Sequence, residues 1–371
     1  MISRIEKLAA IAEQKKIDSF LLTAAPSVKY FSGYFFYFEY GVSPFHFLPA
    51  ALFVKPSYTS TIILADNELQ QEQHLLPGIT VSPYSSYVYE TANQPAQQFL
   101  QQLFAVLDKH NTAKARIGIE PAFFPVLLAD ALAHRYTGIE FVDVSAEIQQ
   151  LRAIKDNDEI ECIKKAAHLC DIGQAAVLKN AEAGISELEL FNIVRTAIES
   201  NAGERVPLMC DLGSGVRTAA GGGMPGNKII ESGDLVLSDF TVCLNGYWGD
   251  SCNTIAVGEP TAEQKKIFAQ VKETLQMGID AIYPGVKALE IDKLMRSYAG
   301  NFPHHGGHGV GIDYHEEPRI VPYNEMVLLP NMVIALEPAV YKNDFGIRLE
   351  HLVRVTENGC EIITRFQHQF Y

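Results

Sequence analysis

The 371-residue chain lacks the features of several protein classes. Its 44 acidic residues outnumber its 30 Lys and Arg, and the net charge of −14 argues against a nucleic acid or an anionic membrane as partner. No apolar run approaches the ~20 residues that span a bilayer, and the charged, amphipathic residues 1–16 lack the apolar centre of a signal peptide. The six cysteines include no CxxC pair. We therefore expect reduced thiols in a cytoplasmic protein.

The length is sufficient for two domains, each with its own core. Residues 1–151 alternate short apolar segments with longer amphipathic ones, which predicts an α/β layer domain. Strands are expected at 17–24, 48–54, 60–65, 115–120 and 141–145, and helices at 1–16 and 94–110.

One segment of this domain is unusually aromatic. Residues 30–47 hold ten aromatic side chains, interrupted by Gly33, Gly41 and Pro44. Two interpretations remain open at this point. The rings pack in a core, or the segment is a loop that presents them to a ligand or partner.

A long charged helical pattern that starts near residue 152 marks the second domain, 152–371. Within it, GISELELFNIVR from Gly184 and GVKALEIDKLMR from Gly285 match as G-(I/V)-x-x-L-E with a later Arg. Each follows a long helical stretch and precedes a pair of extended segments, 234–256 and 332–355. The repeat predicts two related α+β halves that face each other.

The first pair of extended segments carries two acidic residues. Asn245-Gly246 is a strong hairpin signal. With these two residues as the loop, Asp239 lies opposite position 252, and Asp250 becomes its diagonal neighbour on the same face. Two ionised carboxylates on a mostly buried face repel each other. Either one is protonated, or a cation holds both, or one points to solvent at a strand end.

The second pair repeats this arrangement. Glu337 and Glu350 lie on either side of an Asn-Asp turn at 343–344, with matching parity. Arg348 is on the face of Glu350 and could orient a carboxylate. If the halves face each other, four carboxylates converge and roughly two divalent cations would balance their charge.

Histidines supply possible nitrogen ligands. Four lie among glycines in HHGGHGVGIDYHEEP, residues 304–318: His304, His305, His308 and His315. A single histidine is usually structural, but this density favours a site. None of the spacings fits a zincin or a zinc finger, and the glycine-rich residues 219–228 lack the Lys-Ser/Thr of a phosphate loop.

Together these residues resemble the metal signature of the M24 metallopeptidase family, which includes aminopeptidase P, prolidase, methionine aminopeptidase and creatinase. The matching positions are Asp239, Asp250, His308 in GHGVG, Glu337 in LEP and Glu350 in GIRLE. The resemblance implies a creatinase/prolidase N-terminal domain over residues 1–151 and a pita-bread catalytic domain with a pseudo-twofold repeat over 152–371. Methionine aminopeptidases generally lack the N-terminal domain, so the prolidase and aminopeptidase P branch is the nearer one.

The resemblance also implies roles for these residues. Asp239 would bind one metal ion, His308 and Glu337 a second, and Asp250 and Glu350 would bridge them. Manganese is expected, with zinc, cobalt and iron as alternatives. Glu337 would also move the proton of the attacking water.

Three further residues complete the expected catalytic set: His304, His315 and Arg348. The two histidines match family positions that contact the substrate and steady the oxyanion. A homodimer acting on a small peptide or another small molecule is expected.

Two departures from the family pattern leave the substrate open. Gly222 stands where the family usually has a histidine, which would remove a donor and widen the pocket, and Ala339 replaces a frequent glycine. The favoured function is Xaa-Pro peptide hydrolysis. The alternatives are cleavage of a small non-peptide C–N bond, as in creatinase or ectoine hydrolase, and a non-catalytic binding protein on the same fold.

Overall fold

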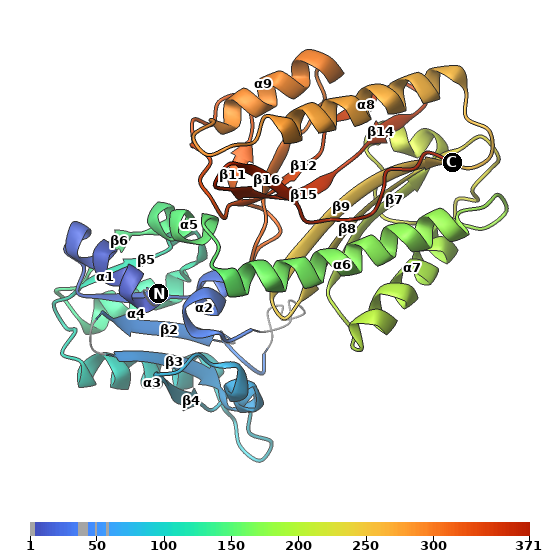
Figure 1. Cartoon of the computed structure of the whole chain (residues 1–371). Coiled ribbons are helices and arrows are strands. Elements are labelled where there is room, and N and C mark those ends of the chain that lie inside the picture. The colour runs from blue at the N-terminus through green and yellow to red at the C-terminus, as the bar shows by residue number, and fades with distance from the viewer. Residues whose placement is uncertain (1–3, 36–43, 49, 57–58) are drawn as a thin grey trace. The chain divides into compact units, whose positions relative to one another are not determined.

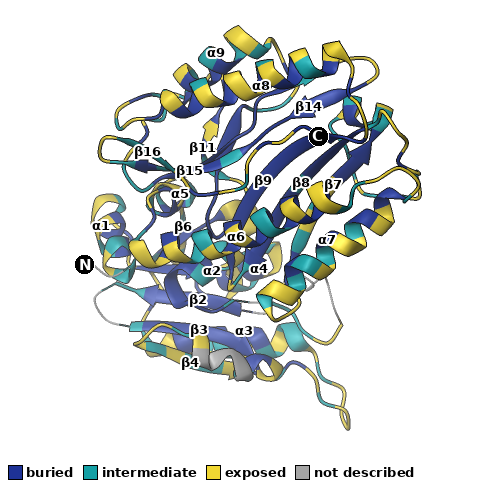
Figure 2. Ribbon diagram, turned by 45° about the vertical axis from the view of Figure 1, so that its right-hand side comes forward, coloured by how far each residue is buried: buried dark blue, intermediate teal, exposed yellow. Residues whose placement is uncertain are grey.

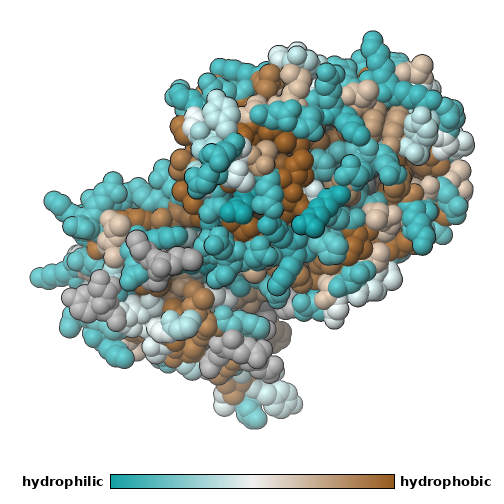
Figure 3. Space-filling view, in the orientation of Figure 1, coloured by the Kyte–Doolittle hydropathy of each residue, from teal (hydrophilic) through white to brown (hydrophobic). Residues whose placement is uncertain are grey.

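The computed structural model describes residues 4–35, 44–48, 50–56 and 59–371. The chain divides into two compact units, Met1–Arg152 and Ala153–Tyr371 (Figure 1). Hydrophilic residues cover most of the face shown in Figure 3. Within the described residues, every helix is too short or too polar to cross a membrane.

The described part of the N-terminal unit contains a six-stranded sheet in the order β4-β3-β2-β1-β5-β6. Strand β1 pairs antiparallel with β2 and parallel with β5. The strands are β1 (Ser19–Leu22), β2 (Ala50–Lys55), β3 (Thr59–Ala65), β4 (Ile79–Tyr84), β5 (Arg116–Ile119) and β6 (Glu140–Asp143). The helices are α1 (Arg4–Lys15), α2 (Ala25–Ser32), α3 (Pro95–Lys109), α4 (Val126–Arg135) and α5 (Ser145–Ala153), with 3-10 segments η1 (Asp66–His74) and η2 (Pro121–Phe123).

The α/β prediction for this unit is confirmed. All five predicted strands and both predicted helices are present, whereas the sequence analysis does not predict β4, α2, α4 or α5. Strand β4 reads ITVSPY, and its proline and polar residues hide the strand signal.

In the described part of the aromatic segment 30–47, some rings pack in the core and that of Phe45 is exposed. Tyr30, Phe31 and Tyr34 are fully buried, so these rings belong to the core. Phe45 is 55% exposed and packs edge-on against Tyr87, with ring centroids 5.0 Å apart. Residues 36–43 lie outside the described residues.

The C-terminal unit is described throughout and is built from two halves. The first comprises α6 (Asn157–Asn180), α7 (Glu187–Ala202), β7 (Leu208–Ser214), η3 (Gly215–Ala220), β8 (Leu235–Leu244) and β9 (Tyr247–Ala256). The second begins with α8 (Ala262–Asp280) and α9 (Ala288–Ala299). Its strands are β10 (Gly307–Gly309), β11 (Glu316–Ile320), β12 (Val333–Leu336), β13 (Ala339–Tyr341), β14 (Gly346–Arg348), β15 (His351–Thr356) and β16 (Gly359–Ile362).

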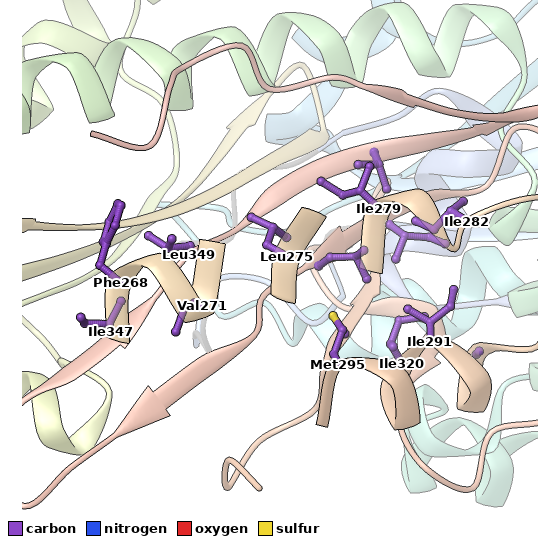
Figure 4. Packing of buried hydrophobic residues seen from close by; sticks show 14 of the residues in the cluster. Phe268, Val271, Leu275, Ile279, Ile282, Ile291, Met295, Ile320, Ile347 and Leu349 are labelled. Atoms are coloured by element: carbon purple, nitrogen blue, oxygen red, sulfur yellow. The ribbon is translucent and has the colours of Figure 1, made fainter. Parts of the chain in front are cut away.

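The strands of the C-terminal unit consist mostly of buried residues, whereas its helices carry many exposed ones (Figure 2). Strands β7-β8-β9 form one sheet, β11-β10-β12-β15-β16 a second, and β13-β14 a separate hairpin. In the second half, α8 buries Val271, Leu275 and Ile279 at intervals of four residues, the spacing of an apolar helical stripe (Figure 4). Burying each of these side chains stabilises the fold by roughly 1.5–3 kcal/mol.

The repeat predicted from the two matching segments is present in the backbone. Gly184 and Gly285 both have left-handed φ values, +106° and +102°. The amide of each donates a 2.9 Å hydrogen bond to a later carbonyl, of Ile230 and of Leu328 respectively. Since only glycine adopts this conformation without strain, the two glycines are matched for the same structural reason.

Candidate metal and active site

The first half presents three carboxylates on one face of its sheet. Asp239 on β8 pairs with Cys252 on β9, as the Asn-Gly turn predicts, and with Asp211 on β7. Thr241 pairs with Asp250 on β9, and its hydroxyl donates a 3.1 Å hydrogen bond to the Asp250 carboxylate. Because residues directly opposite each other share a face, the three aspartates point to the same side.

The second half brings its donors to the same place. His308 lies on β10, opposite Ala335 on β12. This pairing requires glycine at 307, where a Cβ would lie 2.0 Å from the Ala335 carbonyl oxygen. Glu337 follows β12, and Glu350 lies between β14 and β15. The Glu350 amide donates to the carbonyl of Cys252 at 2.9 Å, which joins the two halves beside the acids.

Two groups of side chains have the geometry to hold a metal ion. The first group is Asp250, His308 and Glu350, and the second is His304, His305 and Glu337. In each group the donor atoms lie within 4.8 Å of one another. All three members of the first group are buried, and His308 Nε2 lies 3.6 Å from Asp250 Oδ2.

The carboxylates of Asp239, Asp250 and Glu350 are held in an unfavourable environment. Burial and the neighbouring acids raise the pKa values of Asp250 and Glu350 well above normal. Burial raises the pKa of Asp239 to about 6, although the Arg348 charge opposes the change. Acids in this state bind either protons or cations.

Glu337 and His308 differ from these acids. Burial alone would raise the pKa of Glu337, but the hydrogen bond from His305 and the charges of His308, His305 and Arg348 lower it to about 2. Glu337 is therefore ionised at neutral pH, the form of a carboxylate that can bind a cation. Burial lowers the pKa of His308 to about 4, which leaves a neutral imidazole, the form that binds metals.

Arg348 connects the acids to the histidines. Its Nη2 donates to Asp239 Oδ2 at 2.6 Å, and its Nη1 donates to the Tyr341 hydroxyl at 3.0 Å. That hydroxyl also lies 3.0 Å from His304 Nε2. Arg348 thus holds the Asp239 carboxylate through a single nitrogen, Nη2.

The sequence analysis names His305 among the clustered histidines but gives it no role, and it does not name Tyr341. His305 Nδ1 lies 3.0 Å from Glu337 Oε1. Tyr341 has the same parity as Glu337 on its segment, and this is the one signal that could have identified it.

A cleft of about 850 Å³ unites these residues. Every candidate site residue from the sequence analysis lines it, and the His315 ring centroid lies 4.3 Å from that of His308. An apolar wall completes the cleft, formed by Leu188, Phe191, Leu208, Met209, Met224 and Pro225.

The backbone at Gly222 has a conformation that favours glycine, so this position differs from a histidine site by more than the loss of a side chain. Its φ is +99°, and a Cβ there would lie 3.3 Å from a methyl of Leu237. The chain here packs against β7, where the Leu212 amide donates to the Gly223 carbonyl at 2.9 Å. Gly221 and Met224 line the cleft, and Gly222 does not. The backbone has a conformation that disfavours any side chain at this position.

Comparisons with known proteins agree with this architecture. Residues 161–357 match the family model of metallopeptidase family M24, and residues 4–154 match that of the creatinase/prolidase N-terminal domain. The chain is 29% identical to the Xaa-Pro dipeptidase of Pyrococcus furiosus, over 100% of this chain and 99% of that protein.

Solved structures of similar proteins share this two-domain fold. The prolidase of Pyrococcus horikoshii superposes with a TM-score of 0.83 and 26% identity, over 99% of both chains. The X-Pro aminopeptidase of Thermotoga maritima superposes with a TM-score of 0.84 and 25% identity, over 100% of this chain and 99% of that one.

Proposed function

The chain belongs to metallopeptidase family M24, and we propose on that basis that it hydrolyses Xaa-Pro peptides with the help of divalent metal ions held in the cleft. Proteins similar over their whole length are named Xaa-Pro dipeptidase, prolidase and X-Pro aminopeptidase. These names support the substrate class and leave open whether the cleaved peptides are dipeptides or longer ones.

The donor set fits metal ions. Asp250, His308 and Glu350 form a buried group of two carboxylates and one neutral imidazole, and hard or intermediate divalent ions prefer such ligands. We propose that Asp239 holds one ion, His308 and Glu337 a second, and Asp250 and Glu350 both. Manganese is the proposed metal, and zinc, cobalt and iron also accept these donors.

Divalent ions bound here would polarise a carbonyl oxygen and make water a stronger nucleophile at neutral pH. The residues of the chain supply the rest. Glu337, ionised and inside the cleft, accepts the proton of the attacking water and returns it to the leaving nitrogen. His304 and His315 donate hydrogen bonds to the oxyanion that develops on the substrate carbonyl. Arg348 fixes the Asp239 carboxylate.

One observation carries the proposal: buried carboxylates from both halves converge on His308 in a cleft large enough for a peptide. The test is turnover of Leu-Pro and of Leu-Pro-Ala by the manganese-loaded protein, with Asp250→Asn as the variant. Asp280→Asn is the matched control, because Asp280 is exposed at the end of α8.

The expected result is hydrolysis by the wild type and by Asp280→Asn, and its loss in Asp250→Asn. Cleavage of small amidines or cyclic C–N substrates without any peptide turnover would favour the creatinase-like alternative. Absence of both turnover and metal binding would favour a non-catalytic binding protein.

We also propose a homodimer and a cytoplasmic location. Family membership supports the dimer, and light scattering of the purified protein tests it. Each of the six cysteines is a thiol in the structure, in keeping with a reducing compartment. Fractionation of cells that produce the protein tests the location.

A further inference from the structure

Asp211 is a carboxylate in the cleft with no place in the proposed ligand set. It lies on β7, an edge strand of its sheet, and lines the cleft beside Asp239. Its side chain is 50% exposed, whereas the side chains of Asp250 and Asp239 are 5% and 19% exposed. Asp211 is thus open to whatever enters the cleft.

The pairing of β7 with β8 determines where the Asp211 side chain lies. Asp211 lies directly opposite Asp239, so the two carboxylates are close neighbours on one face. Like charges in such a pair destabilise a sheet. One Arg348 guanidinium serves both acids and is held more closely by Asp239, because its Nη2 lies 2.6 Å from Asp239 Oδ2 and 3.9 Å from Asp211 Oδ2.

The charged residues that line the cleft also favour a cationic ligand. Five carboxylates line it, together with a single guanidinium, that of Arg348. The proposed metal ions and Arg348 engage the other four acids: Asp239, Asp250, Glu337 and Glu350. Asp211 remains as a negative group at the cleft surface, where it attracts a cationic ligand and repels an anionic one.

We propose that Asp211 is a specificity-determining residue that accepts a hydrogen bond from an ammonium group of the substrate. This inference rests on the proposed peptidase function. Two groups of a peptide offer this chemistry, the free α-amino group and the side chain of a lysine. The apolar wall beside Asp211, which includes Met209 two residues earlier on the same strand face, would contact the apolar part of the same substrate residue.

The test compares substrates that differ only in the ammonium group. For the α-amino group the pair is Leu-Pro and its analogue 4-methylpentanoyl-Pro, which lacks that amine. For the side chain the pair is Lys-Pro and norleucyl-Pro. KM and kcat are measured on the manganese-loaded protein, and the analogue is also measured as a competitive inhibitor of Leu-Pro hydrolysis.

Asp211→Asn removes the charge and keeps the shape. We expect it to raise KM for the ammonium-bearing member of one pair about fivefold, with kcat nearly unchanged and the other member unaffected. Met209→Leu is the matched control, and it should change both members of each pair by the same factor. Since Asp211 is half exposed, Asp211→Asn should fold, and Asp211→Ser provides a second neutral variant.

Selectivity that shifts in either pair supports the inference and identifies the ammonium group. Equal effects on both members of both pairs in the neutral variants would overturn it. Failure of the wild type to hydrolyse any Xaa-Pro peptide would instead refute the proposed function, so the two outcomes are distinguishable.

Discussion

The two halves of the C-terminal unit place acids at matching positions but support them differently. In the first half, Asp239 and Asp250 lie inside regular ten-residue strands joined by the Asn245-Gly246 turn. In the second half, Glu337 and Glu350 lie just outside the three-residue strands β13 and β14. The first half thus holds its acids within long, regular strands, and the second holds its acids beside short strands.

The second half also supplies all the nitrogen donors. They are His304, His305, His308, His315 and Arg348, and all follow residue 300. His304 and His315 lie in loops, and His308 and Arg348 lie on the three-residue strands β10 and β14, whereas the long hairpin of the first half presents only alternate residues to the cleft. A duplicated framework can thus keep its acids and diversify the groups around them in one copy.

The strongest test of this comparison is loss of one acid from each half. Asp250→Asn and Glu350→Gln should each lower kcat/KM on the order of 10³-fold and reduce the bound metal, because both acids belong to the buried group around His308. Kinetics and elemental analysis measure the two effects. A loss of less than tenfold from either variant would mean that the halves do not share one metal site.

The next prediction distinguishes a metal-binding histidine of the second half, His308, from a substrate-binding one, His315. His308→Ala should remove metal, since His308 is buried in the donor group, whereas His315→Ala should retain metal and lower kcat about 10²-fold. Elemental analysis beside kcat distinguishes the two. Loss of metal from both variants would show that His315 acts as a ligand.

A smaller effect is the pH dependence of stability that Asp239 of the first half produces. In the metal-free protein the folded pKa of Asp239 is about 6, above its ordinary value of 3.8. The folded state therefore binds more protons at Asp239 between these values, so the Asp239 contribution to the free energy of unfolding should fall on the order of 2 kcal/mol as pH rises from about 4 to above 6. The lowered pKa of His308 acts in the opposite direction, so the Asp239 contribution is measured as the difference between the wild type and Asp239→Asn in denaturant unfolding, with and without manganese. Metal should stabilise the protein more at pH 7.5 than at pH 5, and equal stabilisation would contradict the account.

The smallest effect is at Gly222 in the first half. Gly222→Ala should lower the free energy of unfolding by about 1 kcal/mol, because its φ of +99° disfavours a Cβ. Gly226→Ala is the control, since φ at Gly226 is not positive and the nearest atom to a Cβ there is 4.0 Å away. Equal stability of the two variants would remove the backbone explanation for glycine at 222.

Parts of the site could be read from the sequence because local rules fix them. The Asn-Gly turn determines the pairing of β8 with β9, and with it the shared face of Asp239 and Asp250. The Glu337 and Glu350 positions follow from the parity around residues 343–344, which the β13–β14 register reproduces.

Other parts depend on long-range packing and could not be read. The contact between Tyr341 and His304 spans 37 residues and needs β13 and the loop before β10 in their final places. The sequence does not identify Asp211, because its place in the cleft depends on which strand pairs with β8. Gly222 has a left-handed backbone that a missing histidine alone does not reveal.

The most direct test of the central claim is the number of divalent ions per chain in the wild-type protein after exposure to excess manganese, measured by elemental analysis. The account predicts two ions per chain. A protein that retains none would contradict it, because the clustered acids of the two halves would then coexist without the cations proposed to hold them.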